Sequence, residues 1–284
     1  MSADIIRSLT PPEVDLAVDW AAREGWNPGL ADAPAFLAQD PDGFMGLFRD
    51  GELAACISVV TYRPAFSFLG FYICRPDLRG QGLGWALWQA GMARLGARTV
   101  GLDGVVAQQA NYARSGFVLA HRNIRYGGIA RPPAGEPVPL RAVDAALRAQ
   151  VCAYDRACFQ FERPEFLSLW LSPPQGLALA ALDADTGQAR VTGYGVIRPA
   201  RAGWKIGPVF ADTPAIAAAL FARLAAHAGD QTLVIDVPEP NAPGRALAEA
   251  AGLVPVFETA RMYKGPAPAL PLEKIFGISS FELG

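Results

Sequence analysis

The sequence predicts an α+β protein in which two similar units, each a mixed, mostly antiparallel sheet flanked by helices, follow one another. Three observations lead to this prediction. Apolar strand patterns alternate with helical patterns along all 284 residues. Residues 131–139, the richest Pro and Gly stretch near the middle, have the composition of a linker. The order of elements before that stretch begins again after it, which indicates an internal duplication.

Composition and charge limit the classes of function. Hydrophobic residues make up 51% of the chain and charged residues 18%, so we expect packed cores. A net charge of −2 provides no basic field, and we expect no nucleic-acid or membrane partner. A signal peptide and a membrane-spanning run are both missing from the sequence pattern, which predicts a cytoplasmic protein. Four cysteines without a neighbouring histidine indicate free thiols and no metal site.

The elements of the first half follow from local signals. The capping box Thr10-Pro11-Pro12-Glu13 starts a helix that Gly25 ends, and Asp50-Gly51 marks a hairpin turn. Trp85, Trp88, Met92 and Leu95 have helical spacing. Further predicted elements are a helix at 33–38, strands at 44–48, 53–62, 66–74 and 99–106, a short helix at 109–115 and a strand from residue 117.

The second half has a parallel series of elements. They are helices at 143–155, 164–171, 214–228 and 242–251 and strands at 177–182, 189–197, 204–210 and 232–237, with a turn at 183–187. Residues 232–236 correspond to residues 99–103 of the first half. We therefore divide the chain into a unit at 1–130, a linker at 131–140 and a unit at 141–284. The apolar segment 271–281 is expected to pack back onto the body.

A glycine-rich turn, Arg79-Gly80-Gln81-Gly82-Leu83-Gly84, connects an apolar strand to a helix. Free N–H groups at the start of a helix bind phosphate, glycines let a pyrophosphate approach, and Arg79 can add a charge-assisted bond. Three interpretations compete. A Rossmann loop needs G-x-G-x-x-G, but Trp85 stands at the third glycine, although Asp103 lies where a ribose ligand would. A turn without a ligand and an acyl-CoA loop are the other two.

Two motifs in order resemble the GNAT acetyltransferase family. The segment from Cys74 to Gly84, with its Pro-Asp pair followed by Arg-Gly-Gln-Gly-Leu-Gly, is similar to the family's Gln/Arg-x-x-Gly-x-Gly/Ala loop after a strand. Tyr112, four residues before the pair Gly116-Phe117, is similar to the family's next signature and lies at the expected distance. The resemblance covers about residues 1–130 and implies an N-terminal catalytic GNAT domain that binds acetyl-CoA.

The resemblance also implies a mechanism and a set of site residues. It implies direct transfer of the acetyl group from acetyl-CoA to an amine through a tetrahedral intermediate, with Tyr112 as general acid toward the leaving thiolate. The end of the strand at 66–74 would bind the acetyl carbonyl and pantetheine, and the loop would bind the pyrophosphate. The implied cofactor-binding residues are Tyr72, Ile73, Cys74, Arg79, Gly80, Gln81, Gly82, Leu83, Gly84, Trp85 and Asn111.

The second half resembles a degenerate GNAT-like domain of a tandem subgroup, through residues 193–199, 205–210, 236–241 and 261–263. It departs from the family pattern at both diagnostic places. Residues 210–214, Phe-Ala-Asp-Thr-Pro, replace the glycine loop, and Ala248 stands where the tyrosine would. We therefore expect no acetyl-CoA turnover in this half. It is expected to wall the acceptor pocket or to mediate association, for example into a homodimer.

Several roles stay open in the sequence. The acceptor is a small-molecule or peptide amine, and no base is identified: Asp103 is as much a structural candidate as a catalytic one, and His121 and His227 receive no role. We expect Cys74 not to be a nucleophile, because no histidine is near it in sequence. Two other functions compete with the acetyltransferase: a non-catalytic CoA-binding regulatory or scaffold protein, and an NAD-dependent enzyme.

Overall fold

The structure is a computed structural model that describes residues 4–133, 135–183 and 190–284, so most of the predicted turn at 183–187 lies outside it. The elements of the first half are β1 (Ile5–Ser8), α1 (Pro11–Arg23), α2 (Asp32–Gln39), β2 (Phe44–Arg49), β3 (Glu52–Tyr62), β4 (Phe66–Cys74), α3 (Leu83–Leu95), β5 (Thr99–Val105), α4 (Gln109–Arg114) and β6 (Val118–Gly128). Short 3₁₀ turns at Pro76–Leu78 and Val106–Gln108 precede α3 and α4.

The elements of the second half follow the same order as those of the first. They are β7 (Leu140–Ala142), α5 (Ala145–Phe159), α6 (Pro164–Trp170), β8 (Leu177–Asp183), β9 (Arg190–Pro199), β10 (Trp204–Ala211), α7 (Pro214–Ala228), β11 (Leu233–Pro238), α8 (Ala242–Ala250) and β12 (Val254–Lys264), followed by a 3₁₀ turn at Leu272–Lys274 and by β13 (Ile275–Gly277). The repeated order confirms the predicted duplication. One helix is shifted from its prediction at 143–155: α5 begins later because the carboxylate of Asp144 accepts from the N–H of Leu147 and caps it.

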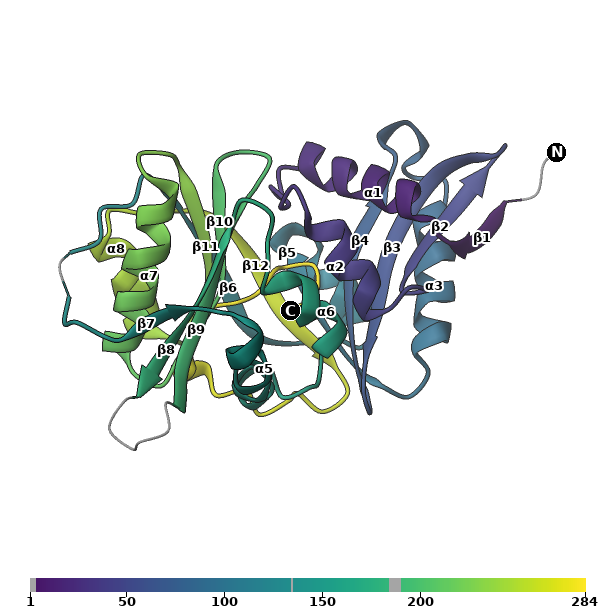
Figure 1. Cartoon of the computed structure of the whole chain (residues 1–284). Coiled ribbons are helices and arrows are strands. Elements are labelled where there is room, and N and C mark those ends of the chain that lie inside the picture. The colour runs from purple at the N-terminus through teal and green to yellow at the C-terminus, as the bar shows by residue number, and fades with distance from the viewer. Residues whose placement is uncertain (1–3, 134, 184–189) are drawn as a thin grey trace.

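The two halves share one sheet because they exchange their last strands. Within the described residues the strand order is β1-β2-β3-β4-β5-β12-β6-β11-β10-β9-β8-β7, with β13 paired to β10. Strand β12 of the second half lies antiparallel between β5 and β6, and β6 of the first half pairs with β11. Figure 1 shows β12, in yellow, in the middle of the molecule between the purple-blue and green halves.

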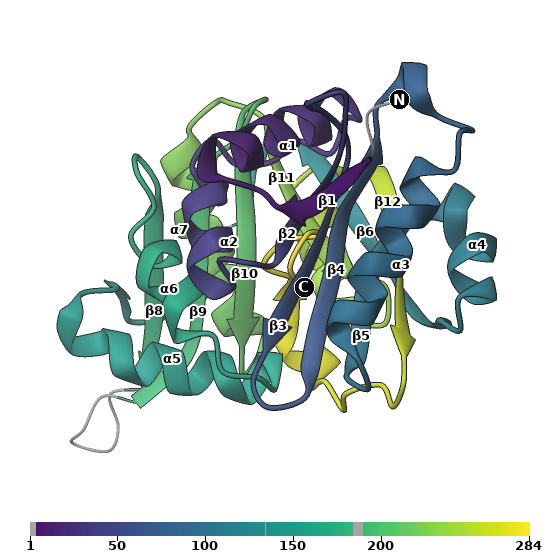
Figure 2. The same cartoon turned by 90° about the vertical axis from the view of Figure 1, so that its right-hand side faces the viewer.

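The helices cover the sheet in three apolar clusters. A central cluster joins α1 and α2 to α5 and α6, and Figure 2 shows these four helices one below another on the same side of the sheet. Helix α3 covers the other face of the first half, and α7 and α8 cover the second half. The segment after β13 is buried in the middle of the molecule, which confirms that the end of the sequence packs onto the body (Figure 1).

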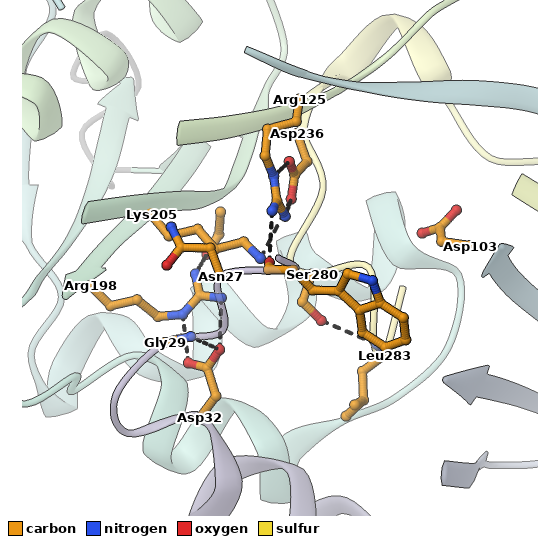
Figure 3. Close-up of polar contacts among 12 residues, drawn as sticks. Asn27, Gly29, Asp32, Asp103, Arg125, Arg198, Lys205, Asp236, Ser280 and Leu283 are labelled. Carbon is orange, nitrogen blue, oxygen red and sulfur yellow. Dashed lines mark hydrogen bonds and ion pairs between the residues drawn. The ribbon is translucent and has the colours of Figure 1, made fainter. Parts of the chain in front are cut away.

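Three buried ion pairs join segments that are far apart in the sequence. Arg125 on β6 pairs with Asp236 on β11 at 2.6 Å. Arg198 on β9 pairs with Asp32 on α2 at 2.7 Å, and Arg261 on β12 pairs with Asp103 on β5 at 2.6 Å. Figure 3 shows the first two of these pairs. Removing one partner of such a pair costs about 3–5 kcal/mol, so the pairs fix how the halves meet.

Candidate functional site

The glycine loop lies between β4 and α3. Gly80 and Gly82 have φ values of +79° and +81°, where a side chain would be strained. Gly82 is the N-cap of α3, and no side chain caps the helix. The first N–H groups of α3 are therefore available to an anion, and the helix macrodipole adds positive potential there. The sequence predicts a phosphate at this place, and an uncapped helix N-terminus has a geometry that suits one.

The strand before the loop diverges from its neighbour. Residues 66–69 of β4 pair in parallel with residues 99–102 of β5, and the described residues make no further pairing between these strands. Phe71, which follows Gly70, has a φ of +47° and lies where the register between β3 and β4 shifts. A cavity of about 580 Å³ opens between the two strands and reaches the glycine loop. The edge of β4 thus has backbone groups without a strand partner facing a cavity.

Most of the residues implied by the family resemblance lie around this cavity. Its lining includes Tyr72, Ile73, Cys74, Arg79, Gly80, Gly82, Leu83, Gly84, Trp85 and Tyr112. Gln81 and Asn111 do not line it: Gln81 accepts a hydrogen bond from Arg49 at 2.8 Å, and the amide of Asn111 donates to Gln108 at 2.6 Å. The structure therefore brings ten of the twelve predicted site residues, Tyr112 among them, to one cavity.

Tyr112 lies on α4 at the far wall of the cavity. Its ring stacks on Trp88 with a centroid distance of 5.8 Å and packs over Gly104, where a Cβ would lie 2.3 Å from the ring. Burial, and then the nearby Tyr72, raise the pKa of the Tyr112 phenol to about 12. The phenol therefore keeps its proton at neutral pH, as a general acid must.

Two other titratable residues of the cavity are held in inactive forms. Burial raises the pKa of the Cys74 thiol, which disfavours the thiolate that a nucleophile needs. Asp103 accepts hydrogen bonds from Arg261 at 2.6 and 2.7 Å and from Asn123 at 2.8 Å. Both carboxylate oxygens are therefore occupied, which favours the structural role among the two that the sequence left open.

Neither histidine belongs to this cavity. His121 on β6 is paired in register with Arg261, and burial, followed by the charge of Arg261, lowers the pKa of its imidazole to about 3. His227 lies at the end of α7, where its ring approaches the carbonyl of Gln175 at 2.9 Å. Neither position gives the histidine a place in the chemistry of the cavity, in agreement with the sequence, which assigns no role to either.

The second half and the helical layer contribute further residues to the cavity, and the sequence motifs predict none of them. Phe257 and Thr259 come from β12, Phe281 and Glu282 from the segment after β13, and Trp26 from the loop after α1. Glu24, at the end of α1, also lines the cavity and pairs with Arg79. No local motif marks these residues, because they reach the cavity through strand exchange and chain packing.

The corresponding place in the second half is filled by the chain itself. Strand β10 pairs in parallel with β11 only at residues 204–206, in the way that β4 pairs with β5. Strand β13 then pairs with β10, and the N–H of Ile278 donates to the carbonyl of Asp236 on β11 at 2.9 Å. Thr213 caps α7 by accepting from the N–H of Ile216, and Ala248 is buried.

The described ranges contain no group of three or more His, Cys, Asp or Glu residues that could hold a metal ion. None of their helices is long and apolar enough to cross a membrane.

Comparisons with known proteins agree with this geometry. The family model described as the acetyltransferase (GNAT) family matches residues 9–117, and the acetyltransferase (GNAT) domain matches residues 151–277. The chain is 31% identical over 273 residues to holothin acyltransferase of Pseudoalteromonas sp. (strain SANK 73390). The aligned region covers 96% of this chain and 92% of that protein.

Solved structures show the same fold. A Pyrococcus horikoshii protein assigned to the acetyltransferases superposes with a TM-score of 0.81 at 21% identity, covering 100% of this chain and 97% of that one. A tandem GNAT protein from the clavulanic acid biosynthesis pathway superposes with a TM-score of 0.62 at 14% identity, covering 94% and 100%. The chain belongs to the GNAT acyltransferase family and carries two GNAT domains in tandem.

Proposed function

We propose that the first half binds acetyl-CoA and transfers its acetyl group to the amine of a small molecule or peptide. The observation that carries this proposal is the open cavity between β4 and β5, with the glycine loop at one border and Tyr112 in its wall. The free helix N-terminus suits the pyrophosphate, and the unpaired edge of β4 suits the pantetheine and the acetyl carbonyl. An acyl-CoA thus fits along the cavity with its thioester between β4 and Tyr112.

The chemistry follows from these positions. The nitrogen of the acceptor attacks the thioester carbonyl, and a C–N bond forms in a tetrahedral intermediate whose oxyanion is stabilised by a backbone N–H of β4. The C–S bond then breaks, and the CoA thiolate takes the phenolic proton of Tyr112. The nitrogen loses one proton to water as the intermediate collapses, the amide product leaves, and Tyr112 regains a proton from solvent. This route needs no acyl-enzyme, in keeping with the raised pKa of Cys74.

The acceptor would occupy the end of the cavity away from the glycine loop. Trp26, Phe71, Phe257 and Phe281 line the cavity together with Glu282. Aromatic walls favour an acceptor with an apolar or planar body next to its amine. Holothin, which the relative's name gives as its acceptor, belongs in the panel of amines to be tested.

The second half would serve the first as a wall rather than as a second catalytic unit. Strand β13 occupies the gap that a pantetheine would need, and the side chain of Thr213 uses an N–H group that a phosphate would need. We therefore propose a single acyl-CoA site per chain. A non-catalytic CoA-binding protein is the competing function, since a chain that lost chemistry in one half could lose it in both.

Thiol release from acetyl-CoA, measured with and without each amine of a panel that includes holothin, tests the proposal. We expect amine-dependent release and formation of the matching N-acetyl product by mass spectrometry. Propionyl-CoA and a longer acyl-CoA measure the preference for the acetyl group. Tight CoA binding without product on any amine would instead establish the non-catalytic alternative.

A further inference from the structure

The cavity has three acidic residues in its described lining: Glu24, Asp103 and Glu282. Arginines engage two of them. Glu24 pairs with Arg79, and Asp103 holds Arg261 through both oxygens. A general base needs a free lone pair near the reacting nitrogen, and neither of these two carboxylates offers one without breaking an ion pair. Glu282 is the carboxylate that is left.

Glu282 is buried without a hydrogen-bond partner. It is 2% exposed, and neither carboxylate oxygen hydrogen bonds to another group in the part of the chain that the structure describes. Burying a carboxylate in this way is costly unless something pairs with it. Buried polar groups left unsatisfied in a native protein call for an explanation such as a ligand, a water or a catalytic role.

The main chain of Glu282 packs against the point where β4 leaves β5. A Cβ on Gly70 would lie 2.5 Å from the carbonyl oxygen of Glu282, so only a glycine at position 70 allows this approach. Gly70 comes directly after the last residue of β4 that pairs with β5. In the proposed function the thioester carbonyl lies along this same edge of β4. The main chain of Glu282 is therefore beside the place where the acceptor nitrogen must stand.

Two buried cations, Arg125 and Lys205, interact electrostatically with Glu282. The Arg125 guanidinium and the Lys205 ammonium lie 4.6 and 5.7 Å from the ring centroid of the preceding residue, Phe281. Burial lowers the pKa of Lys205 and Arg125 lowers it further, while the charges of Glu282 and Asp236 act in the opposite direction. These cations offset the negative charge of Glu282 without occupying its oxygens.

Both cations also have a stable partner of their own. Arg125 forms two hydrogen bonds to Asp236, and Lys205 lies 3.6 Å from the same carboxylate. Figure 3 shows this group beside Ser280 and Leu283, the residues that flank Phe281 and Glu282 in the sequence. The N–H of Leu283 donates to the hydroxyl of Ser280 at 3.1 Å, which holds the segment in a turn. Glu282 is thus fixed in place by its main chain rather than by its carboxylate.

We infer that Glu282 is the general base that deprotonates the acceptor amine. The inference rests on the proposed function, because the base is needed only if an amine attacks an acyl-CoA. An ammonium N–H of the acceptor gives its proton to a Glu282 oxygen, directly or through one water, and the freed lone pair forms the C–N bond. Glu282 passes this proton to solvent. As the C–S bond breaks, the nitrogen loses its second proton to water and Tyr112 protonates the thiolate. Tyr112 then regains a proton from solvent.

The test compares Glu282→Gln with the unmodified protein on two acceptors, an alkylamine that is an ammonium at neutral pH and an amine of low basicity that is already neutral. For the alkylamine we expect kcat to fall by about 10²–10⁴, the usual contribution of a general base, with KM for acetyl-CoA unchanged. For the neutral amine we expect a defect at least about tenfold smaller, because that acceptor needs no deprotonation before attack. A merely structural role would affect both acceptors equally.

Control variants separate the outcomes. Glu273→Gln makes the same change at an exposed position that precedes β13 and is expected to behave like the unmodified protein. Glu282→Asp keeps the carboxylate and should recover at least about tenfold of the activity lost in Glu282→Gln. Thermal unfolding and CoA binding verify that each variant folds.

Three results would overturn the inference. An unchanged kcat in Glu282→Gln, an equal defect on both acceptors, or no recovery in Glu282→Asp would each remove Glu282 as the base while leaving the proposed function intact. Failure of the unmodified protein to acetylate any amine would overturn both the inference and the proposed function.

Discussion

The two halves of the molecule diverge at the same structural point. In the first half, β4 separates from β5 after Leu69 and a cavity opens between them. In the second half, β10 separates from β11 after Ile206, but β13 pairs with β10 in the gap. One fold therefore gives either a binding cavity or a closed core, depending on whether another segment of chain occupies the gap.

The N-termini of α3 and α7, the helices that follow these strands, also differ between the halves. Gly82, in the left-handed conformation, begins α3 without a side-chain cap. Thr213 begins α7 and accepts a hydrogen bond from the N–H of Ile216. A capping side chain stabilises a helix by using an N–H group that an anion would otherwise bind. Stability of the helix and binding of phosphate thus compete for the same N–H groups.

The segment that closes the second half also builds the first. After β13, the chain continues to Phe281 and Glu282, which line the first cavity. Gly70 and Gly207 occupy matching places, and a Cβ on either would lie 2.5 Å from a carbonyl oxygen of this segment. A single stretch of chain therefore accounts for the difference between the halves. It fills the gap in the second half and lines the cavity in the first.

The largest expected effect comes from the residue that has no counterpart in the second half. Tyr112→Phe should lower kcat about 100-fold or more while CoA binding stays unchanged, because the variant keeps the ring but loses the proton for the thiolate. The matched control is Tyr126→Phe, which removes a phenol that donates to Glu249 away from the cavity. Steady-state kinetics on both variants provide the comparison, and equal rates for the two variants would contradict the role of Tyr112.

The second-largest effects are expected at the N-termini of α3 and α7. Gly82→Ala forces a side chain into the left-handed region at a cost of about 1–2 kcal/mol and should weaken CoA binding about tenfold. Thr213→Ala removes a cap and should cost about 1 kcal/mol of unfolding free energy without affecting CoA binding. Titration calorimetry and urea unfolding measure the two quantities. Weaker CoA binding in Thr213→Ala would mean that the second half takes part in the cofactor site.

The smallest effect concerns acid stability. The pKa of His121 is lowered to about 3 by burial and by Arg261, below the unfolded value of 6.5. The unfolded chain therefore takes up the proton first, and stability falls as the pH drops from 6.5 toward about 3. His121→Gln should reduce that slope in urea unfolding between pH 6.5 and 4. A slope in His121→Gln equal to that of the unmodified protein would contradict this role of His121.

The features that depend on residues close together in the chain could be predicted from the sequence. The glycine loop, the tyrosine before the Gly116-Phe117 pair and the repeated order of elements each depend on residues close together in the chain. Their predicted positions agree with β4, α3, α4 and the duplication. A left-handed glycine or a helix start is a local backbone property, and its signature is therefore local too.

The remaining features depend on partners that are far apart in the sequence. The pattern did not indicate strands β1, β7, β12 and β13, and three of these are only three or four residues long. The insertion of β12 between β5 and β6 pairs Thr259 with Val105, more than 150 positions away. Glu282 reaches the cavity through the same long-range packing. No periodicity within either half could place it there.

We propose that each chain has one acyl-CoA site and that this site lies in the first half. Titration calorimetry with acetyl-CoA, on the unmodified protein, Gly82→Ala and Thr213→Ala, distinguishes one site from two. We expect one molecule bound per chain, with the affinity reduced by Gly82→Ala and unchanged by Thr213→Ala. Two molecules per chain, no binding, or an affinity that responds to Thr213 and not to Gly82 would contradict the claim.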